Sequence, residues 1–282
     1  MRGKMNVYAL MLAVTACYTI TSLSDKYAVS VAKFKGNEFT FLMCSSMSVF
    51  IALTLPFQTL FFTPVWQSFA AIFLIAVCKL LEFEMSALVL KELTAFELKA
   101  WLGITLFASY ITDIFYGADL RTLKIICIAA TVFGLACITR SGKEGKVAYK
   151  KIVLPLVLYL AAKYSYGLVI KAFTPYISPT LQLFPALVLL SLLMLVKINP
   201  AKILEKNKKG TLLVVLARIP NAIGMLLENA VIAISLANYS FIQPLILVTL
   251  FLIGLLRKER CTTLNLIGSI ICVIGVVMFQ LI

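Results

Sequence analysis

The chain of 282 residues contains no histidine, the residue that proteins use most for acid–base catalysis at neutral pH and for binding zinc or haem. Its seven cysteines lie in or beside apolar runs and form no C-x-x-C pair, so we expect neither a metal cluster nor disulfides. No G-x-x-x-x-G-K-S/T sequence is present, which removes the usual nucleotide-binding loop. We therefore expect a protein that is not an enzyme and that holds no cofactor and no metal.

Charged residues are also scarce. Only 13% of the residues are charged and 62% are hydrophobic, against roughly 25% and 45–50% in a soluble domain. Apolar runs of about 20 residues recur along the whole length, which predicts an all-α, multi-pass protein of a cell membrane (bacterial inner or plasma membrane) with the lipid bilayer as its surroundings. The net charge of +14 comes from bases in short connectors, where topology signals belong, so we expect no nucleic-acid partner.

Breakers and charge clusters divide the chain into ten predicted transmembrane helices, five in each half. Residues 1–140 form the first half, 141–150 a polar connector and 151–282 the second half. The predicted helices lie near residues 6–30, 38–56, 66–90, 95–116, 122–140, 151–173, 179–197, 210–235, 239–256 and 262–281.

The two halves end on related sequences. Residues 117–138 and 258–279 both begin with a polar, charged stretch and a Thr, and both continue as an apolar run with a Gly at the same place. Aligning Gly134 with Gly275 gives a register of 141 residues, half the length of the chain. Because five spans is an odd number, the second copy enters the membrane with the opposite orientation. The sequence therefore predicts two inverted five-helix repeats, a pattern found in transporters.

Three short segments carry a family resemblance. Residues 117–122 (GADLRT) and 258–262 (KERCT) are charged connectors before the last span of each half, and residues 235–249 read SLANYSFIQPLILVT. These segments resemble the drug/metabolite transporter superfamily in its ten-span EamA-like form. In that family each half ends with a span, a connector of the type G-E-R-x-T and a Gly-containing last span. The resemblance implies a ten-span transporter and leaves the substrate open.

The orientation in the membrane has two readings. Connectors on the side of the termini carry four bases and those on the other side carry seventeen, which by the positive-inside rule places both termini outside the cytoplasm. The family resemblance implies the opposite orientation. We favour the charge count, since a membrane orients a chain by the charges that it carries.

The eighth predicted span carries a polar stripe. Arg218, Asn221, Met225 and Glu228 are spaced i, i+3, i+7 and i+10, which places them on one helical face. Charges at membrane depth cost roughly 2.5–3.5 kcal/mol each on insertion scales, and they are tolerated when they face a wet cavity or a partner. We expect this stripe to line a substrate cavity; the alternative is an ion-pair stripe that only packs against a neighbouring helix.

The third span, its counterpart in the repeat, carries Lys79 and Glu82 at i and i+3. They are predicted to line the cavity, although they could simply pair with each other within the helix. The chain has no ATP site, so uphill transport would use a proton or ion gradient. Glu82 and Glu228 are the natural proton carriers, because a buried carboxyl group can bind and release a proton.

Spans one and six supply aromatic candidates. Tyr18, Ser22 and Asp25 fall in register with Tyr159, Lys163 and Tyr166, and each set, spaced i, i+4 and i+7, shares one helical face. Tyrosine offers a ring face and a hydroxyl group, and a nearby lysine offers a counter-charge for a carboxylate. The alternative is that these tyrosines belong to an interfacial aromatic belt.

These features predict a secondary transporter of a small amphipathic or zwitterionic metabolite, an amino acid or a relative, in a cavity lined by spans one, three, six and eight. One alternative is an exporter of hydrophobic cations, which the lysines and the arginine would repel. Another is a membrane subunit that does not transport and instead assembles with an enzyme or a flippase for a lipid carrier.

Overall fold

A computed structural model describes residues 7–30, 32–93, 98, 101–140, 149–256 and 263–282. Apart from one isolated bridge between Phe62 and Ile177, the regular structure in these residues is helical. The helices are α1 (Val7–Ser30), α2 (Gly36–Thr54) with the short η1 (Leu55–Phe57), α3 (Trp66–Glu92), α5 (Thr105–Phe115), α6 (Thr122–Arg140), α7 (Tyr149–Phe173), α8 (Pro179–Leu195), α9 (Pro200–Lys206), α10 (Lys208–Leu216), α11 (Arg218–Ile234), α12 (Leu236–Leu256) and α13 (Thr263–Leu281).

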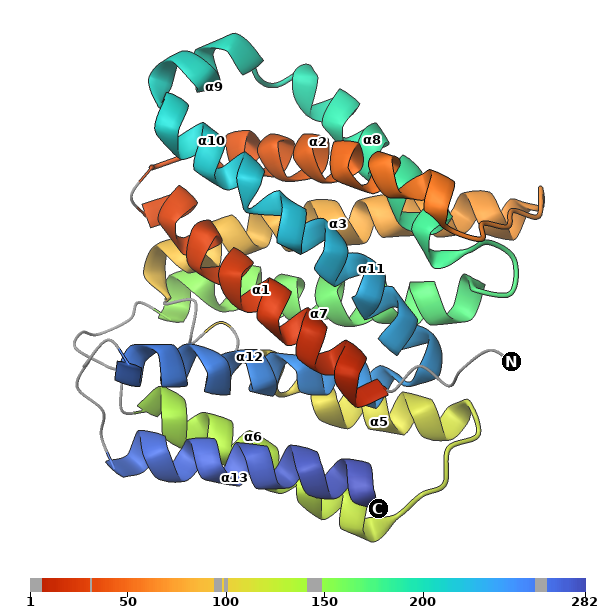
Figure 1. The fold of residues 1–282 in the computed structure, drawn as a ribbon, viewed down its shortest axis with the longest axis vertical. Helices are drawn as coiled ribbons and strands as arrows, with labels where there is room; N and C mark the ends of the chain where they lie inside the picture. The colour runs from red at the N-terminus through yellow and green to blue at the C-terminus, as the bar shows by residue number, and fades with distance from the viewer. Residues whose placement is uncertain (1–6, 31, 94–97, 99–100, 141–148, 257–262) are drawn as a thin grey trace.

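The helices form a bundle with two ends. Most of them run along one common direction, so their termini gather on the left and on the right of Figure 1. The end where α1 begins and α13 finishes is called the terminal end here; α5 and α7 also finish there. The end where α1 finishes and where α2 and α7 begin is called the opposite end.

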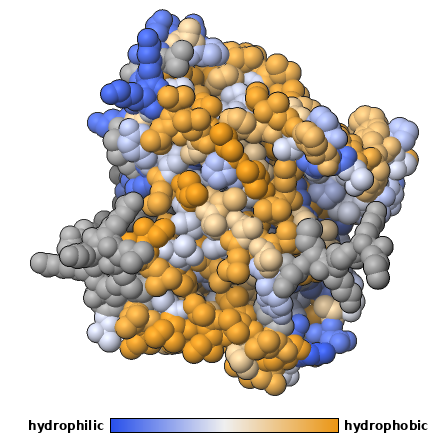
Figure 2. Space-filling view, in the orientation of Figure 1, coloured by the Kyte–Doolittle hydropathy of each residue, from blue (hydrophilic) through white to orange (hydrophobic). Residues whose placement is uncertain are grey.

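The outer surface of the bundle is apolar. Among the described residues, four segments are long and apolar enough to cross a membrane, and they are Val7–Ala28, Gly36–Phe57, Ile152–Phe173 and Lys208–Ile234. Figure 2 shows hydrophobic residues across the face of the bundle, with hydrophilic residues gathered toward its ends. Trp66 is 71% exposed and Leu53 is 66% exposed. A surface of this kind is stable in contact with lipid and not in water.

Two of the predicted spans are interrupted. The segment expected as one helix over 210–235 is divided at Ala217 into α10 and α11. Pro220 has no N–H to donate to the carbonyl group of Leu216, so the backbone ladder breaks there. The segment expected over 95–116 contains a turn at 103–104, where Gly103 weakens the helix before α5 begins.

The connectors also differ in part from the prediction. The polar stretch after α8 is not a plain loop, because it contains α9, whose start is capped by the Asn199 side chain accepting from Ala201 N at 3.1 Å. The connectors predicted at 141–150 and 258–262 lie almost wholly outside the described residues; α7 already begins at Tyr149.

Helices of the first half pack on helices of the second. α1 contacts α11, α3 contacts α7, α2 contacts α8 and α5 contacts α12. The contact between α6 and α13 is very close: a Cβ atom on Gly134 would lie 2.6 Å from Gly268 O, and one on Gly275 would lie 3.0 Å from Cys127 O. Only glycine allows two helix backbones to approach so closely.

Candidate functional site

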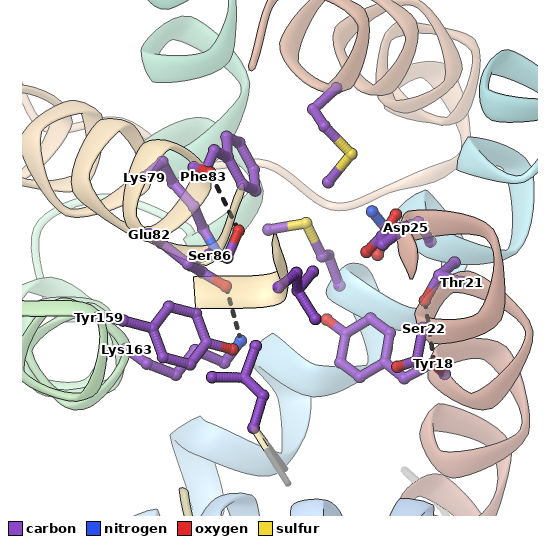
Figure 3. A pocket seen from close by; sticks show the side chains of 15 residues that line it. Tyr18, Thr21, Ser22, Asp25, Lys79, Glu82, Phe83, Ser86, Tyr159 and Lys163 are labelled. Atoms are coloured by element: carbon purple, nitrogen blue, oxygen red, sulfur yellow. Dashed lines mark hydrogen bonds and ion pairs between the residues drawn. The ribbon is translucent and has the colours of Figure 1, made fainter. Parts of the chain in front are cut away.

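A cavity lies among α1, α2, α3, α7 and α11 (Figure 3). It encloses about 670 Å³ when the space at its open mouth is included. Eight of the eleven residues predicted from the sequence line it, and they are Tyr18, Ser22, Lys79, Glu82, Tyr159, Lys163, Asn221 and Met225. The other lining residues are Thr21, Asp25, Met43, Phe83, Ser86, Leu90 and Leu98.

The cavity occupies one half of the bundle's length. Its lining runs along α1 from Tyr18 to Asp25 and along α3 from Lys79 to Leu90. Both helices run from the terminal end to the opposite end. The cavity therefore extends from the middle of the bundle toward the opposite end.

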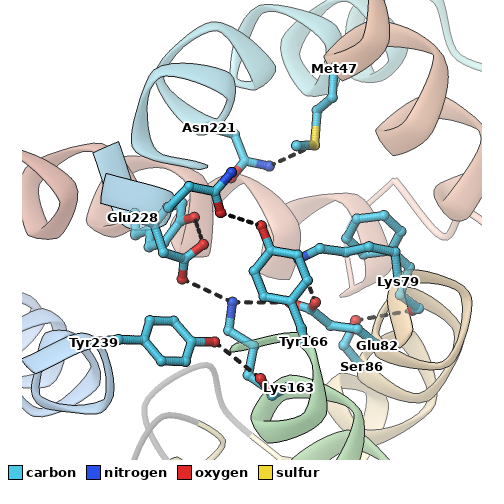
Figure 4. A network of polar contacts seen from close by, with 12 residues as sticks. Met47, Lys79, Glu82, Ser86, Lys163, Tyr166, Asn221, Glu228 and Tyr239 are labelled. Carbon is cyan, nitrogen blue, oxygen red and sulfur yellow. Dashed lines mark hydrogen bonds and ion pairs between the residues drawn. The ribbon is translucent and has the colours of Figure 1, made fainter. Parts of the chain in front are cut away.

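Four charged side chains from three helices meet beside the cavity (Figure 4), three of them in its lining and Glu228 behind it. Lys163 Nζ lies 3.2 Å from Glu228 Oε1 and 3.4 Å from Glu82 Oε1. Lys79 Nζ lies 2.7 Å from Glu82 Oε2, so the local pair expected within α3 is present and is part of a larger group. We call these four residues the ion-pair network. Two positive and two negative charges leave it neutral, which is the condition under which charges are tolerated in a buried site.

Tyrosines surround the lysines of the network. Lys79 Nζ lies 3.7 Å from the ring centroid of Tyr166, and Lys163 Nζ lies 5.6 Å from the ring centroids of Tyr166 and Tyr239. At these distances the ring faces attract the ammonium groups. The Tyr18 hydroxyl donates to Glu228 Oε2, and the Tyr239 hydroxyl donates to Lys163 O at 3.1 Å. The tyrosines thus contact the network from inside the bundle.

Three predicted site residues lie behind the cavity wall. Glu228, Tyr166 and Arg218 are each 0% exposed and do not line the cavity. Glu228 and Tyr166 contact the network lysines directly. Arg218 instead pairs with Asp25, Nη2 to Oδ1 at 2.5 Å, and its Nε donates to Val214 O at 3.1 Å. Its Nη1 also donates to Met43 Sδ at 2.6 Å, so Arg218 borders the cavity through two lining residues, Asp25 and Met43. Asp25 lies on the face of span one that the sequence pattern assigns to Tyr18 and Ser22.

The stripe on α11 is positioned by close contact with α1. A Cβ atom on Gly224 would lie 2.8 Å from Tyr18 Cε1, so glycine allows the tyrosine ring to rest on the α11 backbone. Asn221, one turn earlier, faces the cavity, and its Nδ2 donates to Met47 Sδ at 3.2 Å. All four residues of the predicted stripe are buried.

A second polar cluster, at the terminal end, was missed by the sequence reasoning. The Asp113 carboxylate of α5 accepts from Ser235 Oγ at 2.7 Å, Leu236 N at 3.0 Å and Ala237 N at 2.8 Å, and it also pairs with Lys171 of α7. It caps the start of α12, where a negative charge is stabilised by the free N–H groups. A hollow of about 1000 Å³, open space included, lies beside it. A lone acid in the apolar run of α5 was the available signal.

Comparison with known proteins places the chain by its fold. The chain matches no protein-family model and no curated protein. It resembles solved structures, among them one described as "Crystal structure of protein". That likeness covers 98% of this chain and 96% of the other, with a TM-score of 0.62 and 16% sequence identity. At this identity the similarity is one of fold alone.

Proposed function

We propose that the chain is a secondary transporter of a small amphipathic or zwitterionic metabolite, an amino acid or a relative, coupled to a proton or ion gradient. The observation that carries this proposal is the neutral ion-pair network of Lys79, Glu82, Lys163 and Glu228 beside a cavity with an open mouth. Buried charges that only pack helices would be expected away from a cavity. A zwitterion carries one charge of each sign, so it can exchange partners with such a network and keep it neutral.

The transport chemistry follows from the contacts of Lys163. A substrate carboxylate that binds the Lys163 ammonium competes with Glu228, whose Oε1 lies 3.2 Å from Nζ. A buried carboxylate without its counter-charge is strongly disfavoured, and a proton neutralises it. Substrate binding and proton binding are then linked at Glu228. The apolar part of the substrate packs against Met43, Phe83 and Met225 of the lining.

We further propose ten membrane spans arranged as two inverted repeats, residues 1–140 and 151–282, that rock about the cavity. The helix contacts support this arrangement. Gly134 packs on Gly268, and Gly275 packs on Cys127. Positions 134 and 275 are related by the repeat register of 141 residues, and so are positions 127 and 268. The two contacts therefore join equivalent positions of the two halves. Likewise, α1 packs on α11 and α7 packs on α3. Each of these contacts joins the first span of one half to the third span of the other half.

The described lining favours a zwitterion over a hydrophobic cation. Each carboxylate among the described lining residues has a basic partner: Glu82 has two lysines and Asp25 has Arg218. A cation would have to displace one of these bases without offering a negative charge in return. A zwitterion offers a positive charge to the carboxylate and a negative charge to the displaced base.

The test uses purified protein in liposomes and a mixture of radiolabelled amino acids. With an imposed pH gradient we expect accumulation by the wild type. We expect Glu228→Gln to abolish accumulation and to keep exchange of internal for external amino acids, because shape and hydrogen bonding survive while the proton site is lost. Glu205→Gln, on the exposed surface of α9, is the matched control and is expected to accumulate normally. Absence of both accumulation and exchange in the wild type would contradict the proposal.

A further inference from the structure

Gln243 of α12 is buried without hydrogen bonds. Its side chain is only 2% exposed, and neither Oε1 nor Nε2 has a partner among the described residues. Buried amide groups in folded proteins are almost always paired, with protein or with ordered water. An amide with both of its polar atoms unpaired therefore indicates a ligand.

A small cavity lies at this amide. The other residues that line it are Leu102, Thr105, Lys163, Tyr164, Tyr239 and Ser240. The space between these side chains is about 190 Å³, but most of it is too narrow for a water molecule to enter. The remaining space has room for about one water molecule. Lys163 is the residue common to the linings of this cavity and of the substrate cavity.

The chemistry of the amide selects the ligand. Nε2 is a donor and Oε1 is an acceptor, so a full set of hydrogen bonds needs a ligand that both accepts and donates. An anion would satisfy only Nε2 and a cation only Oε1. Water does both, and the hydroxyl groups of Thr105 and Ser240 supply the further partners that a buried water needs.

Polar contacts lead from this cavity toward the terminal end. The Ser240 hydroxyl lies 2.5 Å from the Ser109 hydroxyl of α5. Ser109 precedes Asp113 by one turn of α5. The Leu236 N–H donates to Asp113, and Ser240 follows Leu236 by one turn of α12. Polar groups thus follow the contact between α5 and α12 from the hollow at Asp113 inward to Lys163, on the side away from the substrate cavity.

We propose that Gln243 binds a water molecule, and that this water and the Ser240–Ser109 hydroxyl pair carry protons from the terminal end to Glu228. Lys163 gives a proton from Nζ to Glu228 Oε1, 3.2 Å away, and takes one from the water, which is resupplied through the hydroxyl pair by hydronium from the solution. The net change is one proton from solution to the Glu228 carboxylate, with Lys163 again an ammonium group. The water site does not depend on the proposed function, whereas the proton route rests on it.

The water is tested by hydroxyl-radical footprinting of the full chain in detergent, since radicals formed from a bound water oxidise the residues beside it. Tyr239, 4% exposed, lines the cavity, whereas Tyr166, 0% exposed, is also buried and does not line it. We expect oxidation of Tyr239 several-fold above that of Tyr166 in the wild type, and a fall to the Tyr166 level in Gln243→Leu. The control is Gln182→Leu on α8, where Nε2 is already bonded to Ile177 O at 3.1 Å. Equal oxidation of Tyr239 in the wild type and in Gln243→Leu would overturn the water site.

The proton route is tested in liposomes that contain a pH-sensitive dye, with a pH gradient and the same amino-acid mixture. We expect proton uptake to fall at least tenfold in Gln243→Leu while exchange of amino acids continues. Ser240→Ala is a second variant, in which proton uptake falls while oxidation of Tyr239 remains, because Gln243 and Thr105 still bind the water. Wild-type proton uptake in both variants overturns the route and leaves the transporter proposal standing. If the wild type moves no amino acid at all, the proposed function fails and the footprinting still decides the water site.

Discussion

The pairing of Lys163 with Glu228 predicts strong coupling between two substitutions. Lys163→Met removes one positive charge and leaves the ion-pair network with a net charge of −1; Glu228→Gln leaves it with +1. Both side chains are at least nine-tenths buried, so neither excess charge is relieved by water. The double variant is neutral again. We therefore expect each single substitution to destabilise the protein strongly and the second one to cost much less in the presence of the first.

The distance sets the size of the effect. Coulomb's law gives about 5 kcal/mol for unit charges 3.2 Å apart at an effective dielectric constant of about 20. The cost of removing the groups from water offsets part of this gain, and breaking a buried pair from one side costs about 3–5 kcal/mol. We expect about 3 kcal/mol for each single variant and a coupling free energy of about 2–3 kcal/mol.

The assay is the free energy of unfolding of the four proteins in dodecyl maltoside micelles with increasing sodium dodecyl sulfate. A second cycle, Lys163→Met with the exposed Glu205→Gln, serves as the control and is expected to be additive. If the loss in the Lys163→Met, Glu228→Gln double variant equals the sum of the two single losses to within about 0.5 kcal/mol, the pair does not exist in solution and the reasoning fails.

Two further substitutions are measured by the same unfolding assay. Gly134→Ala places a Cβ atom 2.6 Å from a backbone oxygen of α13 and should cost about 1–3 kcal/mol, whereas Gly36→Ala, which has open space around it, should be neutral; equal effects would show that α6 and α13 are not so close. Asp113→Asn leaves the Lys171 ammonium without its counter-charge and should cost about 2–3 kcal/mol. Asp119→Asn, at an exposed ion pair, should change stability by less than about 0.5 kcal/mol, and similar losses in both variants would refute a special role for Asp113.

Helical periodicity explains what could be predicted of the site. Spacing along a helix decides which residues share a face, and it brought Arg218, Asn221, Met225 and Glu228 together before any tertiary contact was known. The pair of Lys79 with Glu82 is equally local, because residues three apart are neighbours on a helix. These features depend on the sequence of a single span.

Contacts between spans could not be read in the same way. Lys163 has its partners on α3 and α11, and which helices meet depends on packing of the whole bundle. Asp113 and Gln243 each have one hydroxyl residue a turn earlier, Ser109 and Ser240, and a pair of this kind is too short a pattern to mark a polar stripe. The break at Ala217 had a signal in Pro220, but a proline shows only that a helix is weakened there and not whether it divides.

The close contact between α6 and α13 has the form of a contact between two like subunits. Gly134 meets Gly268 as Gly275 meets Cys127, so the two helices present equivalent surfaces to each other. In an assembly of separate chains this would be an isologous contact, in which one surface patch serves both partners across a two-fold axis. The face of α6 would therefore need no new residue to pair with a second copy of itself.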